Sequence, residues 1–535
     1  MNTIYFNGNI YVERDRFVQA MLVSDGLVQK IGTLEEVTEG LCPKCEREMI
    51  DLEGRTVVPG FNDSHCHALN TGNSLSCVIL HGSTSMEEII AKGRAFMEEH
   101  PLKEGDVLVG RGWNQDYFAE GPALPTRYDL DKITTEYPVV YTRACGHMLV
   151  CNSKALEVAG ITRDSQPLPG GELYRFEDGE PNGLFAENAQ RVIQNIIPVD
   201  SAESLSEKLN IAMAYAASLG ITTVQTNDIG RENWRLTNQA FELTFANNPN
   251  AIRVYSQNTF SEPVTYQDFL DAGHVTGSGT DMFRYGPLKM FVDGSLGART
   301  ALMRNPYADD PTTCGVPTIP VPDFEAMVKM ADDNNCQVAV HAIGDGAIEM
   351  VLNAYDKVIE NGNNKNRHAV VHAQITDNEM LERFRASDVL AQVQPIFIHY
   401  DMNVVAERCG EELASTSYAF GDLFRMGVHT SYGTDSPVEN LQPFENLYCA
   451  VTRKRLDGAR TYREDQCVDI YDAIDQYTIG SAYTEFAEDR KGRLMPGYFA
   501  DFAVLDRNIF EVPADEIKDV KCVRTVVGGN TVFQR

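Results

Sequence analysis

The sequence has little positive charge and no long apolar run. Its 535 residues include 77 acidic and 46 basic side chains, which gives a formal net charge of −31 at pH 7. Such an excess of negative charge works against binding to DNA, RNA or an anionic membrane surface. No run of about 18 apolar residues exists, and the N-terminus has no basic segment followed by an apolar one. We therefore expect a cytoplasmic protein with no nucleic-acid or membrane partner.

Cysteines are also few for a disulfide scaffold. Twelve are scattered through the chain without a framework pattern, which is typical of free thiols in a reducing compartment. Cys42 and Cys45 form one C-P-K-C motif, which would be half of a zinc knuckle or a redox pair. Because no second C-x-x-C completes four thiolate ligands, an ordinary surface loop is the favoured interpretation.

What the chain does have is the composition of a large globular protein. Hydrophobic residues make up 43% and charged residues 23%. Residues 1–56 and 496–535 read as short alternating strands separated by turns such as S-D-G and N-G. We predict that these two ends build one composite, β-sandwich-like domain that brackets the rest of the chain.

Residues 57–495 alternate apolar, β-branched strands with amphipathic helices, a pattern that predicts a parallel sheet. Eight strand-helix units close into a (β/α)8 TIM barrel, so the predicted fold class is α/β. The gap at about 70–215 is too long for one connection, so we expect a long insertion after the first strand. The expected strands are 57–65, 221–228, 251–260, 287–294, 336–345, 368–374, 389–397 and 428–436.

Polar side chains gather where these strands end. The stretch VVPGFNDSHCHAL, residues 57–69, places His65 and His67 two positions apart, so that both imidazoles can face one point. A barrel collects the C-terminal ends of its strands on one rim. Four imidazoles, a carboxylate and a lysine on one rim suit one or two divalent transition metals. The other strand-end residues are Lys289, Asp293, His341, His372, Gln394 and Asp435.

A series of blocks in this order resembles the amidohydrolase superfamily. Within it, the chain is similar to the YtcJ-like amidohydrolases (amidohydrolase family 3), the group that includes N-substituted formamide deformylase. The resemblance covers nearly the whole chain. Its blocks include PGFNDSHCH, HMLVCNSKAL, PGGELYRFEDGEPNG, KMFVDGSLGARTA, HAIGDGAI, RHAVVHAQ, VQP, GTDSPV and GRLMPGYFADFAVLD.

The resemblance implies a ligand set and a chemistry. One metal would be bound by His65, His67 and Asp435, and a second by His341 and His372. Lys289 would bridge both as a carboxylated lysine (a carbamate), with Asp293 as the alternative contact from that strand or as a substrate-binding residue. Zinc is the expected metal, with iron, manganese or cobalt as alternatives.

Catalysis would use the metal-activated hydroxide that such sites generate near neutral pH. Asp435 would accept its proton and pass it to the leaving nitrogen. In the inserted segment, His147 would donate to an oxyanion or substrate carbonyl, and Trp113 would form a pocket wall or simply belong to a core. Gln394 is a weaker substrate-binding candidate, since a polar residue at a strand end often only holds a loop.

Three functions are compatible with these residues. The leading one is a metal-dependent hydrolase of a carbon-nitrogen bond, other than a peptide bond, in a small-molecule amide such as an N-formyl or N-acyl amine. The alternative is a metal-dependent isomerase or decarboxylase, because one barrel can carry different reactions. A non-enzymatic relative is the third, but such a protein would be expected to lack ligands. Barrel enzymes commonly self-associate, so a homodimer is also expected, although no sequence feature requires it.

Overall fold

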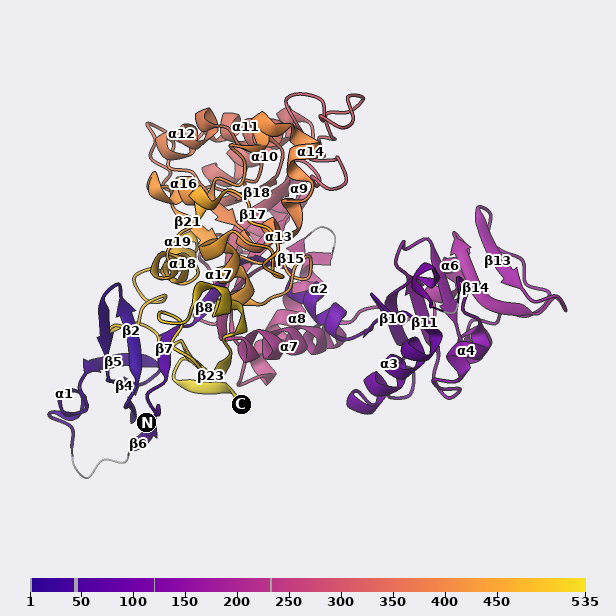
Figure 1. Ribbon diagram of the computed structural model, residues 1–535, viewed down its shortest axis with the longest axis horizontal. Helices are drawn as coiled ribbons and strands as arrows, with labels where there is room; N and C mark the ends of the chain where they lie inside the picture. Colours follow the sequence, from indigo (N-terminus) through magenta and orange to yellow (C-terminus); the bar gives the residue numbers. More distant parts are fainter. Residues whose placement is uncertain (1, 43–46, 120, 231–232) are drawn as a thin grey trace. The chain divides into compact units, whose positions relative to one another are not determined.

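The computed structural model describes residues 2–42, 47–119, 121–230 and 233–535 (Figure 1). The chain divides into two compact units, of which one comprises Met1–Thr71 with Leu209–Arg535 and the other Gly72–Lys208. Cys45 lies outside the described residues, so the interpretation of the C-P-K-C motif stays a prediction. Among the described helices, none is both long enough and apolar enough to cross a lipid bilayer.

The larger unit is organised around an eight-stranded sheet in which every neighbouring pair is parallel. This confirms the predicted (β/α)8 fold. In six of the eight strands at most one residue is not buried, as the β-branched runs in the sequence indicate. The strands are β8 (Phe61–Cys66), β15 (Ile221–Gly230), β16 (Arg253–Thr259), β17 (Phe283–Phe291), β18 (Val338–Ala342), β19 (Ala369–His372), β20 (Leu390–Val393) and β21 (Thr430–Tyr432).

The first and last strands of this sheet, β8 and β21, are joined by a seam of polar contacts. Asp435 donates its backbone N–H to the carbonyl of His65 at 2.8 Å, and His67 donates to the carbonyl of Ser436 at 2.8 Å. The buried Asp63 carboxylate accepts from the backbone and hydroxyl of Thr434 and from the Tyr477 hydroxyl. Burial raises the pKa of Asp63 to about 7 although these donors act against the shift. The seam therefore fixes Asp435 beside the two histidines of β8.

Helices follow the barrel strands and bury one face each. On α10 the buried residues Phe324, Met327, Val328 and Ala331 have the spacing of one helical stripe. The helices of this unit and its borders are α1 (Leu34–Thr38), α2 (Ala68–Leu75), α7 (Ala202–Ser218), α8 (Trp234–Asn247), α9 (Pro263–Asp271), α10 (Val321–Asp333), α11 (Asp345–Tyr355), α12 (Asn378–Ala386), α13 (Ile398–Asp401), α14 (Val405–Cys409), α15 (Glu411–Ala414), α16 (Phe420–Arg425), α17 (Pro443–Thr452), α18 (Ile470–Gln476) and α19 (Ile479–Thr484), with short 3-10 turns η3 (Pro395–Phe397), η4 (Glu464–Gln466) and η5 (Ala514–Asp519).

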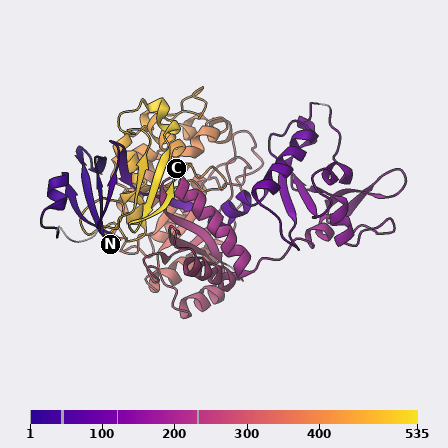
Figure 2. The same ribbon diagram turned by 90° about the horizontal axis from the view of Figure 1, so that it is seen from below.

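Both chain ends contribute to one of two further sheets in this unit. Its order is β24-β23-β22-β7-β2-β3, and β22 pairs with β7, so N-terminal (indigo) and C-terminal (yellow) strands lie side by side (Figure 2). Tyr5 packs edge-on against Phe502 between the sheets, with ring centroids 4.9 Å apart. This confirms the predicted β structure built from both termini. The strands are β2 (Asn9–Glu13), β3 (Arg16–Val18), β7 (Thr56–Pro59), β22 (Phe502–Leu505), β23 (Cys522–Val527) and β24 (Asn530–Gln534), and those of the four-stranded sheet β5-β4-β1-β6 are β1 (Asn2–Phe6), β4 (Ala20–Ser24), β5 (Leu27–Gly32) and β6 (Arg47–Asp51).

The smaller unit is the insertion predicted after the first barrel strand. It contains a six-stranded mixed sheet of order β13-β14-β12-β11-β10-β9. Ser85 caps α3 by accepting from the Glu88 backbone N–H, and the buried Ile89 and Ile90 of that helix join an apolar core. Its elements are β9 (Val78–Ile79), α3 (Met86–Glu99), β10 (Leu108–Trp113), η1 (Gln115–Tyr117), α4 (Arg127–Asp131), β11 (Val139–Arg143), β12 (Met148–Cys151), α5 (Ser153–Val158), β13 (Gly171–Arg175), β14 (Pro181–Glu187) and α6 (Gln190–Gln194).

Candidate metal centre

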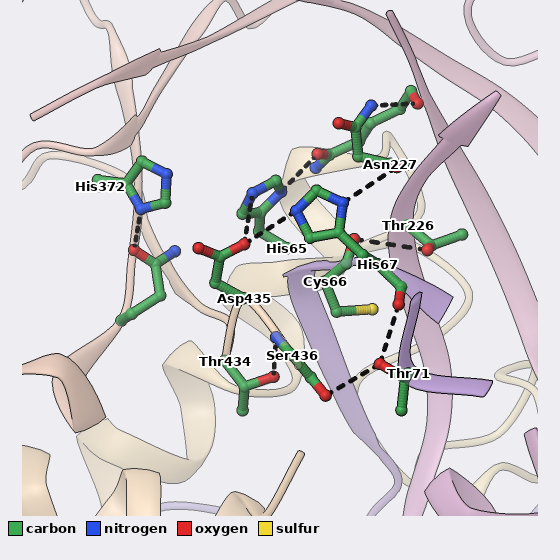
Figure 3. Close-up of polar contacts among 12 residues, drawn as sticks. His65, Cys66, His67, Thr71, Thr226, Asn227, His372, Thr434, Asp435 and Ser436 are labelled. Atoms are coloured by element: carbon green, nitrogen blue, oxygen red, sulfur yellow. Dashed lines mark hydrogen bonds and ion pairs between the residues drawn. The ribbon is translucent and has the colours of Figure 1, made fainter. Parts of the chain in front are cut away.

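Three buried side chains from three barrel strands form the core of the site. His65 is the second-to-last residue of β8, His372 ends β19, and Asp435 follows β21, so each comes from the C-terminal end of a parallel strand. One ligand atom from each lies within 4.8 Å of the others. Figure 3 shows the imidazoles of His65 and His67 directed at the Asp435 carboxylate. The distances from Asp435 Oδ1 are 3.3 Å to His65 Nε2 and 3.1 Å to His67 Nε2.

The remaining predicted histidine, His341, extends this group from β18. Its ring centroid lies 4.5 Å from that of His372, and the His372 centroid lies 5.5 Å from that of His65. The four imidazoles and the carboxylate predicted on the barrel rim are therefore neighbours in the structure. Such a set of nitrogen and oxygen donors suits a divalent transition metal such as zinc.

Burial controls the protonation of these ligands. It lowers the pKa of His65 to about 4 and that of His372 well below its ordinary value, so both imidazoles are neutral at pH 7. Burial opposes ionisation of Asp435, but the contacts from His65 and His67 outweigh it and hold its pKa well below the usual range. Neutral imidazoles beside a carboxylate are the protonation states that a cation requires of its ligands.

Lys289 of β17 is completely buried beside this group. Burial lowers the pKa of its amine to about 7, against the opposing attraction of Asp435 and Asp293. Its Nζ lies 4.1 Å from the centre of the Phe291 ring and makes no hydrogen bond. An amine with this pKa is largely unprotonated above pH 7 and so can react as a nucleophile.

Two buried nitrogen atoms of this group have no hydrogen-bond partner, and this bears on whether a cation fits the site. Both His65 Nε2 and Lys289 Nζ are buried and lack a hydrogen bond. Buried polar atoms of this kind are uncommon in folded proteins and call for a specific explanation, such as a bound ion. Together with the chemistry of the neighbouring donors, they indicate that the residues present fit a divalent metal.

Each of the four imidazoles also contacts a protein oxygen through one ring nitrogen. Nδ1 of His65 lies 2.7 Å from the Gln257 side-chain oxygen, and Nδ1 of His372 lies 2.7 Å from that of Gln394. Backbone carbonyls hold the other two rings, from Asn227 to His67 Nδ1 and from Gly294 to His341 Nε2, both at 3.1 Å. One nitrogen of each ring therefore faces the protein and leaves the other for the centre.

Asp293 lies at the edge of this group, where its carboxylate binds backbone. It accepts hydrogen bonds from the N–H groups of Leu302, Ile343 and Gly344, which connects the loop after β17 to the end of β18. One of its oxygens also lies 3.4 Å from His341 Nε2. The substrate-binding role given to Asp293 stays a prediction, since the contacts seen here are those of a loop anchor.

Gln394 was predicted as a substrate contact, and the structure places it behind His372. The equivalent residue behind His65, Gln257, was not found from the sequence. The available signal was a glutamine within the buried strand RVYSQNT, which resembles the QVQP pattern around Gln394. That signal does not identify the residue that Gln257 contacts, because the contact joins β16 to β8 across 192 positions of the sequence.

The two predicted residues of the insertion occupy different environments within that unit. Trp113 is fully buried in its apolar core and donates its indole N–H to the Tyr141 carbonyl at 2.9 Å. His147 is exposed, with Nδ1 3.2 Å from a Glu187 carboxylate oxygen. Trp113 thus has the core environment that was the alternative to a pocket wall. The substrate contacts of both residues stay predictions.

Comparisons with known proteins identify the family to which the chain is similar. A family model described as amidohydrolase family matches residues 48–533. YtcJ of Bacillus subtilis, named as an amidohydrolase, is 32% identical over 541 residues, which is 100% of both chains. N-substituted formamide deformylase of Arthrobacter pascens is 25% identical over 548 residues, 98% of this chain and 96% of that protein. A solved metal-dependent hydrolase of Pyrococcus horikoshii has a TM-score of 0.76 at 29% identity and covers 96% of this chain and 99% of its own.

Proposed function

This chain belongs to the amidohydrolase family, and we propose that it is a metal-dependent enzyme that hydrolyses a carbon-nitrogen bond, other than a peptide bond, in a small molecule. The proposed substrates are N-formyl or N-acyl amines. The observation that carries the proposal is the buried cluster of His65, His372 and Asp435 beside the unpartnered Lys289 amine. The name of the Arthrobacter relative, an N-substituted formamide deformylase, supports the choice of bond.

We propose that His65, His67 and Asp435 hold one divalent metal ion and that His341 and His372 hold a second. Zinc is our first choice, with iron or manganese as alternatives for the same donors. When bound, such ions supply Lewis-acid activation of water and of the substrate carbonyl. Lys289 is proposed to bridge them as a carbamate, which forms when its neutral amine adds to carbon dioxide and releases a proton.

Asp435 is the proposed proton carrier of the reaction. Its carboxylate is ionised in the resting site, and it lies at the centre of the cluster, within 3.3 Å of both His65 and His67. It would accept a proton from the attacking water and transfer it to the leaving nitrogen, which must be protonated to depart as an amine. His147 is proposed to donate a hydrogen bond to the oxygen of the reacting carbonyl.

The direct test is amine release from a panel of N-formyl, N-acetyl and N-acyl compounds by zinc-loaded, manganese-loaded and chelator-stripped protein. We expect turnover that is lost on stripping and restored by metal. Metal-loaded protein that releases no amine or ammonia from any compound would contradict the proposed bond and favour the isomerase or decarboxylase alternative.

Two neighbouring histidines provide a matched control for the metal requirement. His372 lies at the C-terminal end of β19, whereas His368 precedes the same strand and contacts Asp332 at 3.1 Å. The variant His372→Asn should lose bound metal and turnover together. His368→Asn removes an equally buried imidazole and should retain the metal content of the native protein.

A further inference from the structure

Two buried glutamines hold the metal-site histidines in the same way from different strands. Gln257 in β16 lies behind His65, and Gln394, directly after β20, lies behind His372, each with Oε1 2.7 Å from the Nδ1 atom of its ring. Both amides are completely or almost completely buried, at 0% and 1% exposure. At this depth, the histidine contact is governed by the protein and not by bulk water.

The orientation of each amide is fixed by its other end. Gln257 donates its side-chain N–H to the Ser64 carbonyl at 3.0 Å, and Gln394 donates to the Gln392 carbonyl at 3.2 Å. A carbonyl oxygen can only accept, so the nitrogen of each amide must face the backbone. The oxygen of each amide must then face the imidazole.

This orientation determines which ring nitrogen carries the proton. An amide oxygen has no hydrogen to give, so Nδ1 must be the donor in both contacts. A neutral imidazole protonated on Nδ1 has its free electron pair on Nε2. In His65 that atom is 3.3 Å from Asp435 Oδ1 and is buried without a hydrogen bond of its own.

We propose that Gln257 and Gln394 are positioning residues that fix His65 and His372 in the Nδ1-protonated tautomer and so present both Nε2 atoms for metal binding. The inference rests on the proposed metal-dependent function, which it extends from the ligands to the residues behind them. Neither glutamine needs to touch substrate for this role. It also gives Gln394 a task different from the substrate contact predicted from the sequence.

The pair differs from the more acidic arrangement that metal sites often use. A carboxylate is a frequent partner of a metal-binding histidine, and it adds negative charge behind the ring. Here the partners behind His65, His372 and His67 are two amides and one backbone carbonyl, all of them neutral. The two glutamines thus orient their rings without adding charge to the centre.

Gln392 offers a matched control two positions before Gln394 on the same side of β20. It is equally buried, and its side-chain nitrogen lies 3.3 Å from Oε1 of Gln225. Gln394 uses only the backbone carbonyl of Gln392, which any substitution keeps. Replacing Gln392 by Leu therefore changes the polar barrel interior but leaves the proposed tautomer contacts in place.

The first measurement is the tautomer itself, read by nitrogen NMR of the metal-free, histidine-labelled full chain at pH 7. His65 and His372 are assigned from the signals missing in His65→Asn and His372→Asn. We expect the native protein to show both residues protonated on Nδ1, and Gln394→Leu to lose this preference at His372 alone. Native protein with either ring protonated on Nε2 would overturn the inference, whatever the variants do.

The second measurement is zinc affinity, by competition with a fluorescent chelator. We expect Gln257→Leu and Gln394→Leu to bind zinc about 10 to 100-fold more weakly, as is typical when a partner of a metal-binding histidine is removed. Gln392→Leu should stay within about 3-fold of the native protein, since it leaves those partners intact. Native affinity in both test variants, or an equal loss in Gln392→Leu, would overturn the inference. Neither measurement uses turnover, so failure of the amide assay with intact zinc binding would count only against the proposed function.

Discussion

The interior of the barrel and the interior of the inserted unit are built from different side chains. Under the metal centre the barrel contains Gln225, Gln257, Gln392 and Gln394, all buried, and two of them contact histidine ligands. The inserted unit instead has a cluster of aliphatic and aromatic residues around Trp113. A buried amide gains little net stability even when it is hydrogen-bonded, whereas buried apolar surface is the main source of stability. The barrel interior therefore supports a site, and the inserted core chiefly supports its own fold.

Asp435→Asn should give the largest functional effect. It tests whether the barrel side chains support the reaction, in contrast to the core of the inserted unit. The substitution keeps the size of the side chain but removes the proton acceptor, so we expect turnover to fall by about 10² to 10⁴-fold. The measurement is kcat normalised to bound metal, with the midpoint of thermal unfolding as the check on folding. A variant with full metal and more than a tenth of native kcat would show that another group carries the proton.

Trp113→Ala should give the opposite result, a loss of stability without a loss of metal. Removing a fully buried indole from an apolar core costs about 3 to 5 kcal/mol in the free energy of unfolding. Denaturant unfolding and limited proteolysis within residues 72–208 would measure the change. Trp113→Phe keeps most of the apolar volume and serves as the control. Unchanged stability combined with a large rise in KM would assign Trp113 to the substrate instead.

His147→Gln examines whether the inserted unit also supplies chemistry. If His147 donates to the reacting carbonyl as proposed, its loss should lower kcat by about 10² to 10³-fold. The exposed pair with Glu187 is worth at most about 1 kcal/mol, so stability should barely change. Glu187→Gln breaks the same pair without removing the imidazole and should keep native kcat. Equal activity in both variants would leave all of the proposed chemistry on the barrel.

The buried Lys289 amine should give a pH-dependent stability to the metal-free protein in bicarbonate-free buffer. Its folded-state pKa of about 7 lies below the ordinary 10.5, so between these values the unfolded chain binds the extra proton. Stability should therefore rise with pH across this window, by at most about 1.4 kcal/mol per pH unit. Chemical unfolding at pH 7, 8 and 9 would measure the slope. The same slope in Lys289→Met would show that other groups cause it.

The sequence was sufficient to predict the barrel and its rim. Each strand shows as a β-branched apolar run, and a parallel barrel brings all strand ends to one side, so His65, His341, His372 and Asp435 could be grouped without coordinates. It was insufficient for contacts between strands. Gln257 has its role only because its side chain reaches His65 of β8 past the intervening strand β15, and a local pattern does not report such a contact. The exact domain limits at residues 56/57 and 495/496 stay predictions.

The seam between β8 and β21 has a consequence for how the protein is made. His65 and His67 lie near the start of the chain, and His67 precedes its partner Asp435 by 368 positions. At about 5 to 20 residues per second, a ribosome needs roughly 20 to 70 s to cover that distance. During this interval the nascent chain carries the two histidines but not the carboxylate that completes their cluster. Barrel closure and assembly of the full ligand set are therefore one late event in the biogenesis of this protein.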